Sequence, residues 1–386
     1  MLEVCESGTL EEMSLEEIKK ILEYEYGDEL KKSKKEIEKG EIGKGEIIEY
    51  KYDEQTEMYI SKIGLKSYHK SFIDNIEDGD MIRISRNRPS PIENLEGGEF
   101  GIVKWYSEDV IWLMSPNKVS ERKVYMVRAT PFFLLKIQKE LLDEFEKNGN
   151  QFWKDVIFKK SQNLQNNKST KFSFDTFHFP LNKSQKEACQ NSISLLEKDG
   201  PSFWLIHGPP GTGKTTTITE ILLQAKKMGK KVILTSHTNT AIDNALEKLI
   251  EIGGEKDIVR IGKLKVSEKL RKVSREINFL SELILNERKS IIGTTLSKLH
   301  ILTWLEKELK NKKPHPIADL IIIDEASMVD ELTFAALLAL INLNSVMHFI
   351  VVGDENQLPP IGVGRPFSDI LFFLRKEGYE RNITKL

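Results

Sequence analysis

The sequence predicts an α/β protein in which a small β-barrel, flanked by helices, precedes a mostly parallel sheet. Between Lys44 and Arg128, short runs of alternating apolar and polar residues are separated by turn signals such as EDGD and EGGE. From about Phe177 onward, apolar runs alternate with helical segments, which is typical of a parallel sheet. A glycine-rich loop at 208–215 follows the first of these runs and precedes a helical segment.

The first helix is predicted over residues 14 to about 38. Ser14 and Glu17 have the spacing of a capping box, and apolar residues between Leu15 and Leu22 share one face. The runs EIIEYKY, MYISKI, DMIRIS, FGIVKWY and VIWLM then predict a barrel of about six strands. A second helix begins near Pro131, and we expect the two helices to pack together as a stalk.

The second half of the chain contains the strands of the predicted sheet. The apolar runs are FWLIH, KVILTS, SIIGTT, LIIID and HFIVVG. The polar run at 161–170 before them has the composition of a linker. The expected organisation is a helical segment at 1–40, a barrel at 41–128, a helix and linker at 129–176, and the sheet domain at 177–386.

The composition is that of a soluble globular protein, with 30% charged residues among 386. Two cysteines, Cys5 and Cys189, are too few for a disulfide framework or a cysteine-rich metal site. The acidic N-terminus lacks the features of a signal peptide and no run is long enough to span a membrane, so we expect a cytoplasmic protein without a membrane partner. The net charge of -2 gives no electrostatic sign of nucleic-acid binding, so that function must rest on motifs.

The glycine-rich loop matches the phosphate-loop pattern. We expect its backbone amides and the following helix to bind the phosphates of ATP, with Lys214 bridging the β- and γ-phosphates and Thr215 holding Mg²⁺. The alternative is a glycine-rich turn of chance composition, and kinases, AAA+ proteins and transporters share the pattern. The predicted nucleotide-binding residues are Gly208, Pro209, Pro210, Gly211, Thr212, Gly213, Lys214, Thr215 and Thr216.

Two later motifs narrow the function. Asp324 and Glu325 follow a strand of β-branched residues, so Asp324 is expected to hold Mg²⁺ through water and Glu325 to activate the attacking water. Alone, such a pair is more often a helix cap. Gln357, in the loop GDENQLPP after HFIVV, has the chemistry to sense the γ-phosphate, although in isolation the loop is better explained as a polar turn. Lys214 and Asp324 are 110 positions apart, about twice what a compact AAA+ core needs.

These segments resemble the motifs of superfamily 1B helicases of the Upf1/DNA2/NAM7 group, which includes the Smubp-2-like enzymes. The matching segments are GPPGTGKTTT, TSHTNTAIDNALEKL, IIGTTLSKL, LIIIDEASMVDE and VVGDENQLPP. The form DEAS favours this group over the UvrD-like branch. The resemblance implies a RecA-like fold for 177–386, a short helical insertion near 262–289, and an ATP- and Mg²⁺-dependent motor on single-stranded DNA or RNA, moving 5′ to 3′.

Further site residues follow from matching positions. The segment at 181–185 resembles the family's Q motif, so Gln185 is expected to contact adenine, although Asn182 and Gln185 also have capping spacing. The other matching positions predict contacts with a phosphodiester backbone, with a polar loop or helix cap as the alternative. They are Thr238, Asn239, Thr240, Asp243, Asn244, Thr294 and Thr295.

The sequence ends at Leu386, where the family's Gln-Tyr-Arg motif is expected. The hypothesis is therefore the N-terminal, ATP-binding part of a helicase, expected to be monomeric, with the second RecA-like domain separate or truncated. There are two alternatives. One is a non-catalytic module that has an ATPase-like fold and binds nucleic acid or a partner protein. The other is another kind of P-loop ATPase.

Overall fold

The computed structural model describes residues 14–386 except 55–57, 77–78, 88–98, 120, 158–175, 263–265, 276, 278–289 and 311–315. The predicted linker at 161–170 and most of the predicted helical insertion at 262–289 lie outside the described residues. Within that insertion, the described stretch holds a 3-10 turn at Glu268–Leu270 and a short strand at Ser274–Arg275 rather than a long helix.

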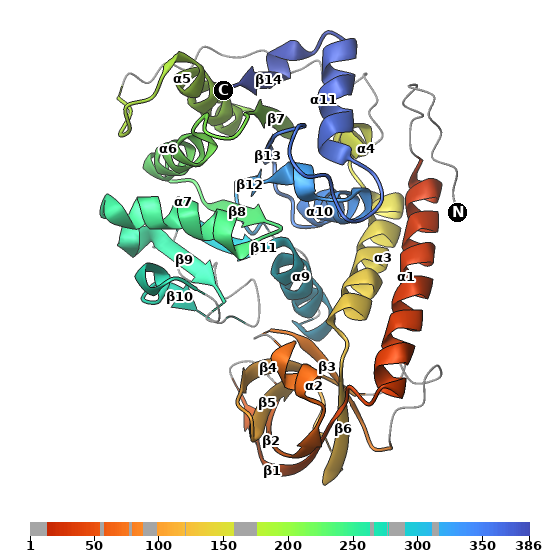
Figure 1. Ribbon diagram of the computed structural model, residues 1–386. Coiled ribbons are helices and arrows are strands. Elements are labelled where there is room, and N and C mark those ends of the chain that lie inside the picture. The colour runs from red at the N-terminus through yellow and green to blue at the C-terminus, as the bar shows by residue number, and fades with distance from the viewer. Residues whose placement is uncertain are drawn as a thin grey trace.

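A closed antiparallel barrel of six strands forms the lower part of the molecule (Figure 1), as predicted. The strands close in the order β1-β2-β5-β4-β3-β6, and their inward side chains, such as Ile63, Val103 and Leu113, form a separate apolar core. A short helix, α2 (Lys70–Asp74), follows β2. The strands are β1 (Gly43–Asp53), β2 (Met58–Tyr68), β3 (Met81–Ser85), β4 (Glu99–Tyr106), β5 (Val110–Ser115) and β6 (Lys123–Arg128).

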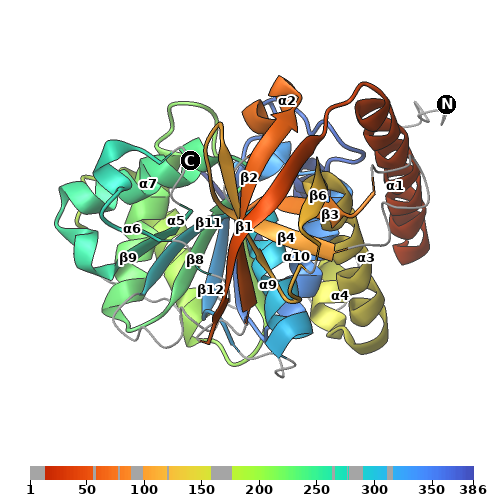
Figure 2. The same cartoon turned by 90° about the horizontal axis from the view of Figure 1, so that it is seen from below.

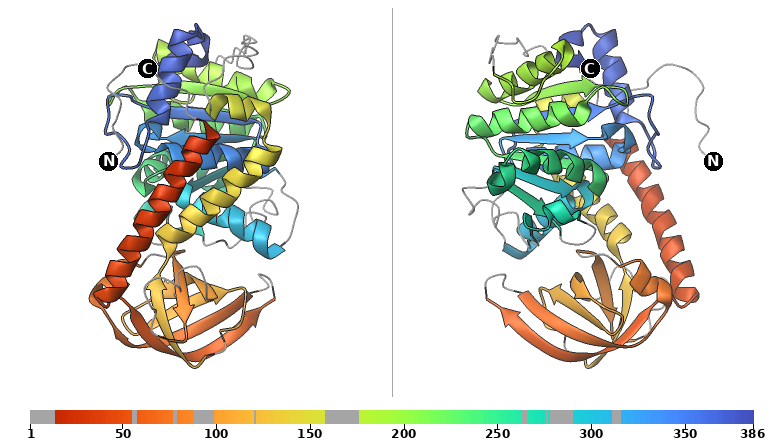
Figure 3. Two further views of the ribbon diagram at one scale, coloured as in Figure 1. Left: turned by 90° about the vertical axis from the view of Figure 1, so that its right-hand side faces the viewer. Right: turned by 60° about the vertical axis from the view of Figure 1, so that its left-hand side comes forward.

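Two long helices connect the barrel to the rest of the molecule. Helix α1 (Leu15–Glu38) begins with the predicted capping box, and α3 (Thr130–Asn148) follows β6 directly. They lie side by side (Figure 3), joined by Lys19, whose Nζ lies 2.7 Å from Asp143 and 2.6 Å from Glu146. Aromatic contacts between Phe100 of β4, Phe133 of α3 and Trp304 then hold the barrel against the sheet domain.

The upper part is an eight-stranded sheet in the order β10-β9-β11-β8-β12-β13-β7-β14, and every neighbouring pair is parallel. Five strands match the predicted apolar runs, whereas β9, β10 and β14 were not predicted. The strands are β7 (Ser202–His207), β8 (Val232–Ser236), β9 (Ile258–Ile261), β10 (Ser274–Arg275), β11 (Ile291–Thr295), β12 (Leu320–Asp324), β13 (His348–Gly353) and β14 (Ile383–Lys385).

Both faces of the sheet are covered by helices, which explains why its strands are apolar throughout rather than alternating. Alternate residues of β12 belong to the two cores on opposite faces of the sheet. Leu320 and Ile322 pack with α5, α6 and α7 on one face. Ile321 and Ile323 pack with α4, α9, α10 and α11 on the other face. Seen from the barrel end, the two groups of helices lie on opposite sides (Figure 2). The helices are α4 (Gln151–Ile157), α5 (Lys183–Ser194), α6 (Lys214–Lys227), α7 (Asn239–Glu251), α9 (Leu296–Lys310), α10 (Glu331–Leu343) and α11 (Pro366–Lys376).

The strand order decides where the motifs meet. Strands β12, β13 and β7 are consecutive neighbours, so the loops after them leave the same edge of the sheet side by side. Those loops carry the Asp-Glu pair, the GDENQLPP segment and the phosphate loop. Ligands in parallel sheets bind at this carboxyl edge.

Candidate nucleotide site

The phosphate loop leaves the buried strand β7 after His207 and enters α6 at Lys214. Gly211 and Gly213 have φ of 81° and 86°, which side chains with a Cβ rarely adopt, so the glycines are required here. The Thr212 hydroxyl donates to the carbonyl of Pro209 at 2.8 Å, closing the loop, and the Gly208 amide donates to the Gly353 carbonyl at 3.0 Å. The remaining amides lie at the N-terminus of α6, where the helix dipole favours an anion.

The three motifs of the predicted ATP site meet at Gln357. In the amide orientation that satisfies both neighbours, its nitrogen donates to Glu325 Oε2 at 2.7 Å and its oxygen accepts from Lys214 Nζ at 3.2 Å. Lys214 Nζ also donates to the Gly208 carbonyl at 2.9 Å. One residue from each motif is therefore within hydrogen-bond distance of the next.

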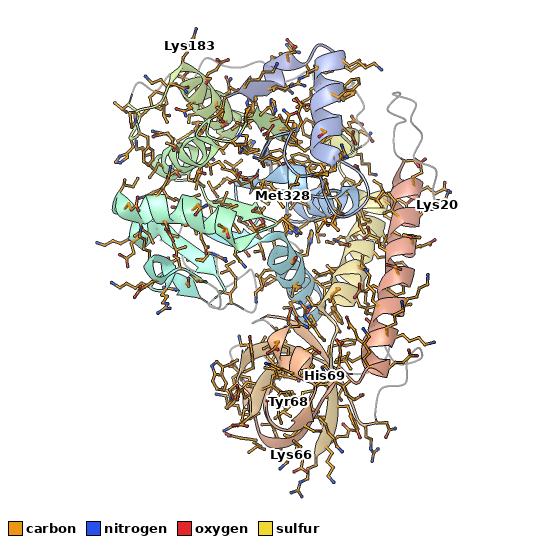
Figure 4. The ribbon with its side chains drawn as sticks, in the orientation of Figure 1. Lys20, Lys66, Tyr68, His69, Lys183 and Met328 are labelled. Carbon is orange, nitrogen blue, oxygen red and sulfur yellow. The ribbon has the colours of Figure 1, made fainter. Side chains whose placement is uncertain are left out.

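Asp324 is buried at the end of β12, and its Oδ1 accepts a hydrogen bond from the Glu325 amide at 2.8 Å. Burial and the neighbouring charge of Glu325 raise the pKa of Asp324 to about 7, despite opposing effects of that hydrogen bond and of Lys214. Glu325 itself adopts φ of 53°, in the left-handed region, which turns the chain sharply after the strand. Figure 4 shows Met328, in the turn that follows, at the middle of the sheet domain.

These groups fit Mg²⁺ with a nucleotide. A buried carboxyl whose charged form is disfavoured gains from a nearby cation, and Thr215 adds a hydroxyl one residue after Lys214. Within the described chain, no group of three or more His, Cys, Asp or Glu side chains forms a metal cage. The hydroxyl of the next residue, Thr216, is used within the protein: it accepts a hydrogen bond from Lys248 of α7 at 2.7 Å.

Gln185 uses both ends of its side-chain amide within the protein. Its oxygen accepts from the Asn182 amide at 2.9 Å in a complete capping box at the start of α5. Its nitrogen donates to the Thr212 carbonyl at 2.8 Å, and a Cβ at Gly213 would collide with that nitrogen. The geometry therefore gives Gln185 the capping role that the sequence left open, together with a contact to the phosphate loop. Its contact with adenine stays a prediction.

Sequence reasoning did not single out His207. Its Nε2 lies 3.4 Å from Asp354 Oδ1 and 3.7 Å from Glu355 Oε1, so the last residue before the phosphate loop faces the acids of the GDENQLPP loop. Glu355 in turn pairs with Arg375 of α11 at 3.1 Å. The only signal was the position of a histidine at the end of a buried strand beside a loop with two acids.

Four of the residues predicted to bind nucleic acid take part in internal hydrogen bonds, and three of the four lie at the start of α7. Thr238 caps α7 by accepting from the Ala241 amide at 3.4 Å. Asp243 is buried and accepts from Nε of Arg260 at 2.6 Å, while Asn239 accepts from the same guanidinium. Arg260, buried in the unpredicted strand β9, holds the N-terminal part of α7 in place.

The other predicted nucleic-acid residues differ in access. Thr240 and Asn244 are exposed on the first turns of α7, where a nucleic-acid strand could reach them. Thr294 is fully buried inside β11, so a direct contact is blocked in this conformation, and among the described residues its hydroxyl has no hydrogen-bond partner. Thr295 is partly exposed, and its hydroxyl accepts from the Lys298 amide at 3.4 Å.

Comparison with known families matches part of the sheet domain. A family model described as an AAA domain matches residues 190–363, which include the phosphate loop, the Asp-Glu pair and Gln357. Over the described helices, none is long and apolar enough to cross a membrane.

Three relatives extend the comparison. An uncharacterised ATP-dependent helicase from Methanocaldococcus jannaschii is 31% identical over 194 residues, covering 50% of this chain and 28% of the relative. The DNA replication ATP-dependent helicase/nuclease DNA2 of Homo sapiens is 34% identical over 194 residues, covering 48% of this chain and 16% of DNA2. The DNA-binding protein SMUBP-2 of Mesocricetus auratus is 45% identical over 89 residues, covering 23% of this chain and 8% of SMUBP-2. The chain thus covers less than a third of each relative.

Proposed function

We propose that this chain, a superfamily 1B helicase-like protein of the Upf1/DNA2 group, binds ATP with Mg²⁺ at the carboxyl edge of its sheet and uses hydrolysis to move on single-stranded nucleic acid. Its parallel sheet is then a RecA-like domain. The observation that carries the proposal is the position of Gln357 between Lys214 and Glu325, because it joins the three motifs of a nucleic-acid motor in one site.

Each residue has a role that suits its position. The phosphate-loop amides and Lys214 hold the phosphates, with Lys214 exchanging its contact with the Gly208 carbonyl for the β- and γ-oxygens. Thr215 and Asp324 would hold Mg²⁺, Asp324 through a water molecule. When bound, the metal neutralises charge on the transferred phosphoryl group. Glu325 orients the attacking water and accepts its proton, and Gln357 contacts the γ-phosphate or that water.

The proposed binding of single-stranded nucleic acid rests on the exposed residues of α7 and on the similarity to helicases. Thr240 and Asn244 are exposed at the start of a helix that follows β8 at the same sheet edge, where small polar groups and helix-start amides bind phosphodiester oxygens. Contacts of this kind do not distinguish bases, so single-stranded DNA and single-stranded RNA are both candidate substrates.

Nucleotide titration and hydrolysis assays test the proposal. We expect Mg²⁺-dependent ATP binding that Lys214→Ala abolishes, and hydrolysis that single-stranded nucleic acid stimulates. The resemblance to superfamily 1 implies that arginine fingers lie on a second RecA-like domain. An arginine finger commonly raises the rate of hydrolysis by roughly 10³ or more. Hydrolysis is therefore measured with the chain alone and with such a domain supplied. If the wild type showed no ATP binding and Lys214→Ala did not differ from it, the proposal would be refuted. Binding without stimulated hydrolysis, even with the second domain, would favour a non-catalytic module.

A further inference from the structure

Lys248 of α7 reaches the first turn of α6, directly after the phosphate loop. Its Nζ donates a hydrogen bond to the Thr216 hydroxyl at 2.7 Å, and both side chains are half-buried. Helices α6 and α7 are neighbours on one face of the sheet (Figure 1) and share its apolar core. The side chain of Lys248 therefore crosses from one helix to the other and places its ammonium group beside a residue only two positions after Lys214.

The first turn of α6 offers hydrogen-bond donors to an anion. The Thr217 amide donates to the Gly213 carbonyl at 2.9 Å, so the amides of Lys214, Thr215 and Thr216 precede the regular hydrogen bonds of the helix. The Thr216 hydroxyl accepts from Lys248, so its own proton can be donated to a bound anion. An anion held there is two hydrogen-bond lengths of roughly 3 Å each from the ammonium group. Opposite charges at this distance attract each other appreciably near a protein surface.

The charge of Lys248 is not neutralised within the described part of the chain. The two acids that flank it on α7, Glu247 and Glu251, lie 3.9 Å and 2.8 Å from a different lysine, Lys269. On α6, Glu220 lies one turn after Thr216, but it is buried and its carboxylate accepts from two backbone amides, both at 3.0 Å. The ion pairs among the described residues do not include Lys248, so its charge is available to attract an anion at the start of α6.

We propose that Lys248 is a further nucleotide-binding residue, which attracts the α- and β-phosphates that ATP and ADP share. The inference rests on the proposed function, because it assumes that the phosphate loop holds a nucleotide. In a phosphate loop the lysine reaches the β- and γ-phosphates, whereas the loop amides surround the α- and β-phosphates. Thr216 lies further into the helix than Lys214 and holds the second ammonium group on that side. Lys248 keeps this bond when a phosphate binds, since an ammonium group has three donors.

The test separates the charge of the side chain at position 248 from its shape. Lys248→Met keeps an unbranched chain without the charge, whereas Lys248→Arg retains the charge. Lys227→Met is the matched control, because Lys227 is exposed at the other end of α6 and its loss changes the net charge equally. For each variant of the whole chain, the affinities for ADP and for a non-hydrolysable ATP analogue are titrated with Mg²⁺ at low and high salt. Thermal unfolding is recorded without nucleotide.

We expect Lys248→Met to weaken both nucleotides by the same factor, roughly five- to tenfold at low salt, as for one partly exposed charge contact. The factor should shrink at high salt, because salt screens the attraction. Lys248→Arg and Lys227→Met should bind as wild type, and the melting temperature of Lys248→Met without nucleotide should equal that of wild type.

Three results would overturn the role of Lys248 while leaving the proposed function intact. They are an unchanged ADP affinity in Lys248→Met, an equal loss in Lys248→Arg, and a loss that high salt does not reduce. Absence of nucleotide binding by the wild type would instead overturn the proposed function and this inference with it.

Discussion

Gln357 donates a hydrogen bond from its side-chain amide to Glu325 Oε2 at 2.7 Å. The two residues are brought together by the pairing of β12 with β13, whose carboxyl ends lie side by side. In the proposed function Glu325 activates the attacking water, so a neighbour that orients its carboxylate would also control how well it does so. The contact would then join the proposed nucleotide sensing to the chemical step.

Replacing Gln357 by alanine separates catalysis from binding. We expect kcat to fall by roughly 10²-fold, because losing one oriented polar group at a reacting centre has an effect of this order. ATP affinity should change only a few-fold, since the phosphate loop and Lys214 are intact. Steady-state hydrolysis together with equilibrium titration gives both values. Asn356→Ala, at an exposed neighbouring position, is the control, and a Gln357→Ala variant with wild-type kcat would contradict the assignment.

The raised pKa of Asp324 predicts how stability depends on pH. The folded protein favours the protonated carboxyl, so this residue contributes most stability below its unfolded pKa, near 4, and that contribution is lost as pH rises towards about 7. Without Mg²⁺, Asp324→Asn should therefore stabilise the protein at pH 8 by on the order of a few kcal/mol, and much less at pH 4.5. Denaturant unfolding at the two pH values measures the difference. An equal effect at both would mean that the carboxyl is not desolvated.

Gln185 offers a choice between two roles. Losing its capping box and its contact with Thr212 should lower the free energy of unfolding by about 1 kcal/mol in Gln185→Ala. If the residue acts by holding the phosphate loop, ATP and GTP should both bind more weakly and by similar factors. Competitive titration with the two nucleotides decides. A loss confined to ATP would establish the adenine contact that the sequence predicts.

The fold was largely predictable because its signals are local. The five predicted strands of the sheet are continuous runs of β-branched and other apolar residues, and the barrel strands alternate. The strands β9 and β14 are short, with four and three residues, and β9 contains an arginine, so neither has a pattern that distinguishes it from a loop. They are strands because their neighbours complete the hydrogen bonding.

The site was predictable as motifs but not as contacts. The spacing of Lys214, Glu325 and Gln357 does not reveal that their side chains touch, because this depends on which strands are neighbours. In the same way, Asp243 matched a position predicted to bind nucleic acid. Its hydrogen-bond partner Arg260, however, lies in the β-strand β9, which the sequence did not reveal. Burial of Thr294 follows from the position of β11 inside the sheet, which periodicity does not give.

The residues predicted to bind nucleic acid fall into an exposed group and a buried group, and mutagenesis can distinguish the two. Thr240→Ala and Asn244→Ala should each weaken binding of single-stranded nucleic acid roughly two- to tenfold, the worth of one hydrogen bond, without changing the melting temperature. Arg260→Ala leaves the buried Asp243 unpaired and should cost about 3 kcal/mol or more of stability. Fluorescence anisotropy with a labelled oligonucleotide and thermal unfolding give the two readouts. The assignment fails if Thr240→Ala and Asn244→Ala both bind as wild type.

Gly27 lies in the middle of α1, and an alanine there is expected to stabilise the stalk. A Cβ at this position meets no atom within 4 Å, and the backbone is not in the left-handed region. Neither packing nor conformation therefore requires glycine, and its replacement in a helix interior gains roughly 0.5–1 kcal/mol. Gly213→Ala is the matched contrast, since its φ of 86° and the nearby Gln185 amide both oppose a side chain. The melting temperature should move in opposite directions for the two variants, and a destabilised Gly27→Ala would contradict the prediction.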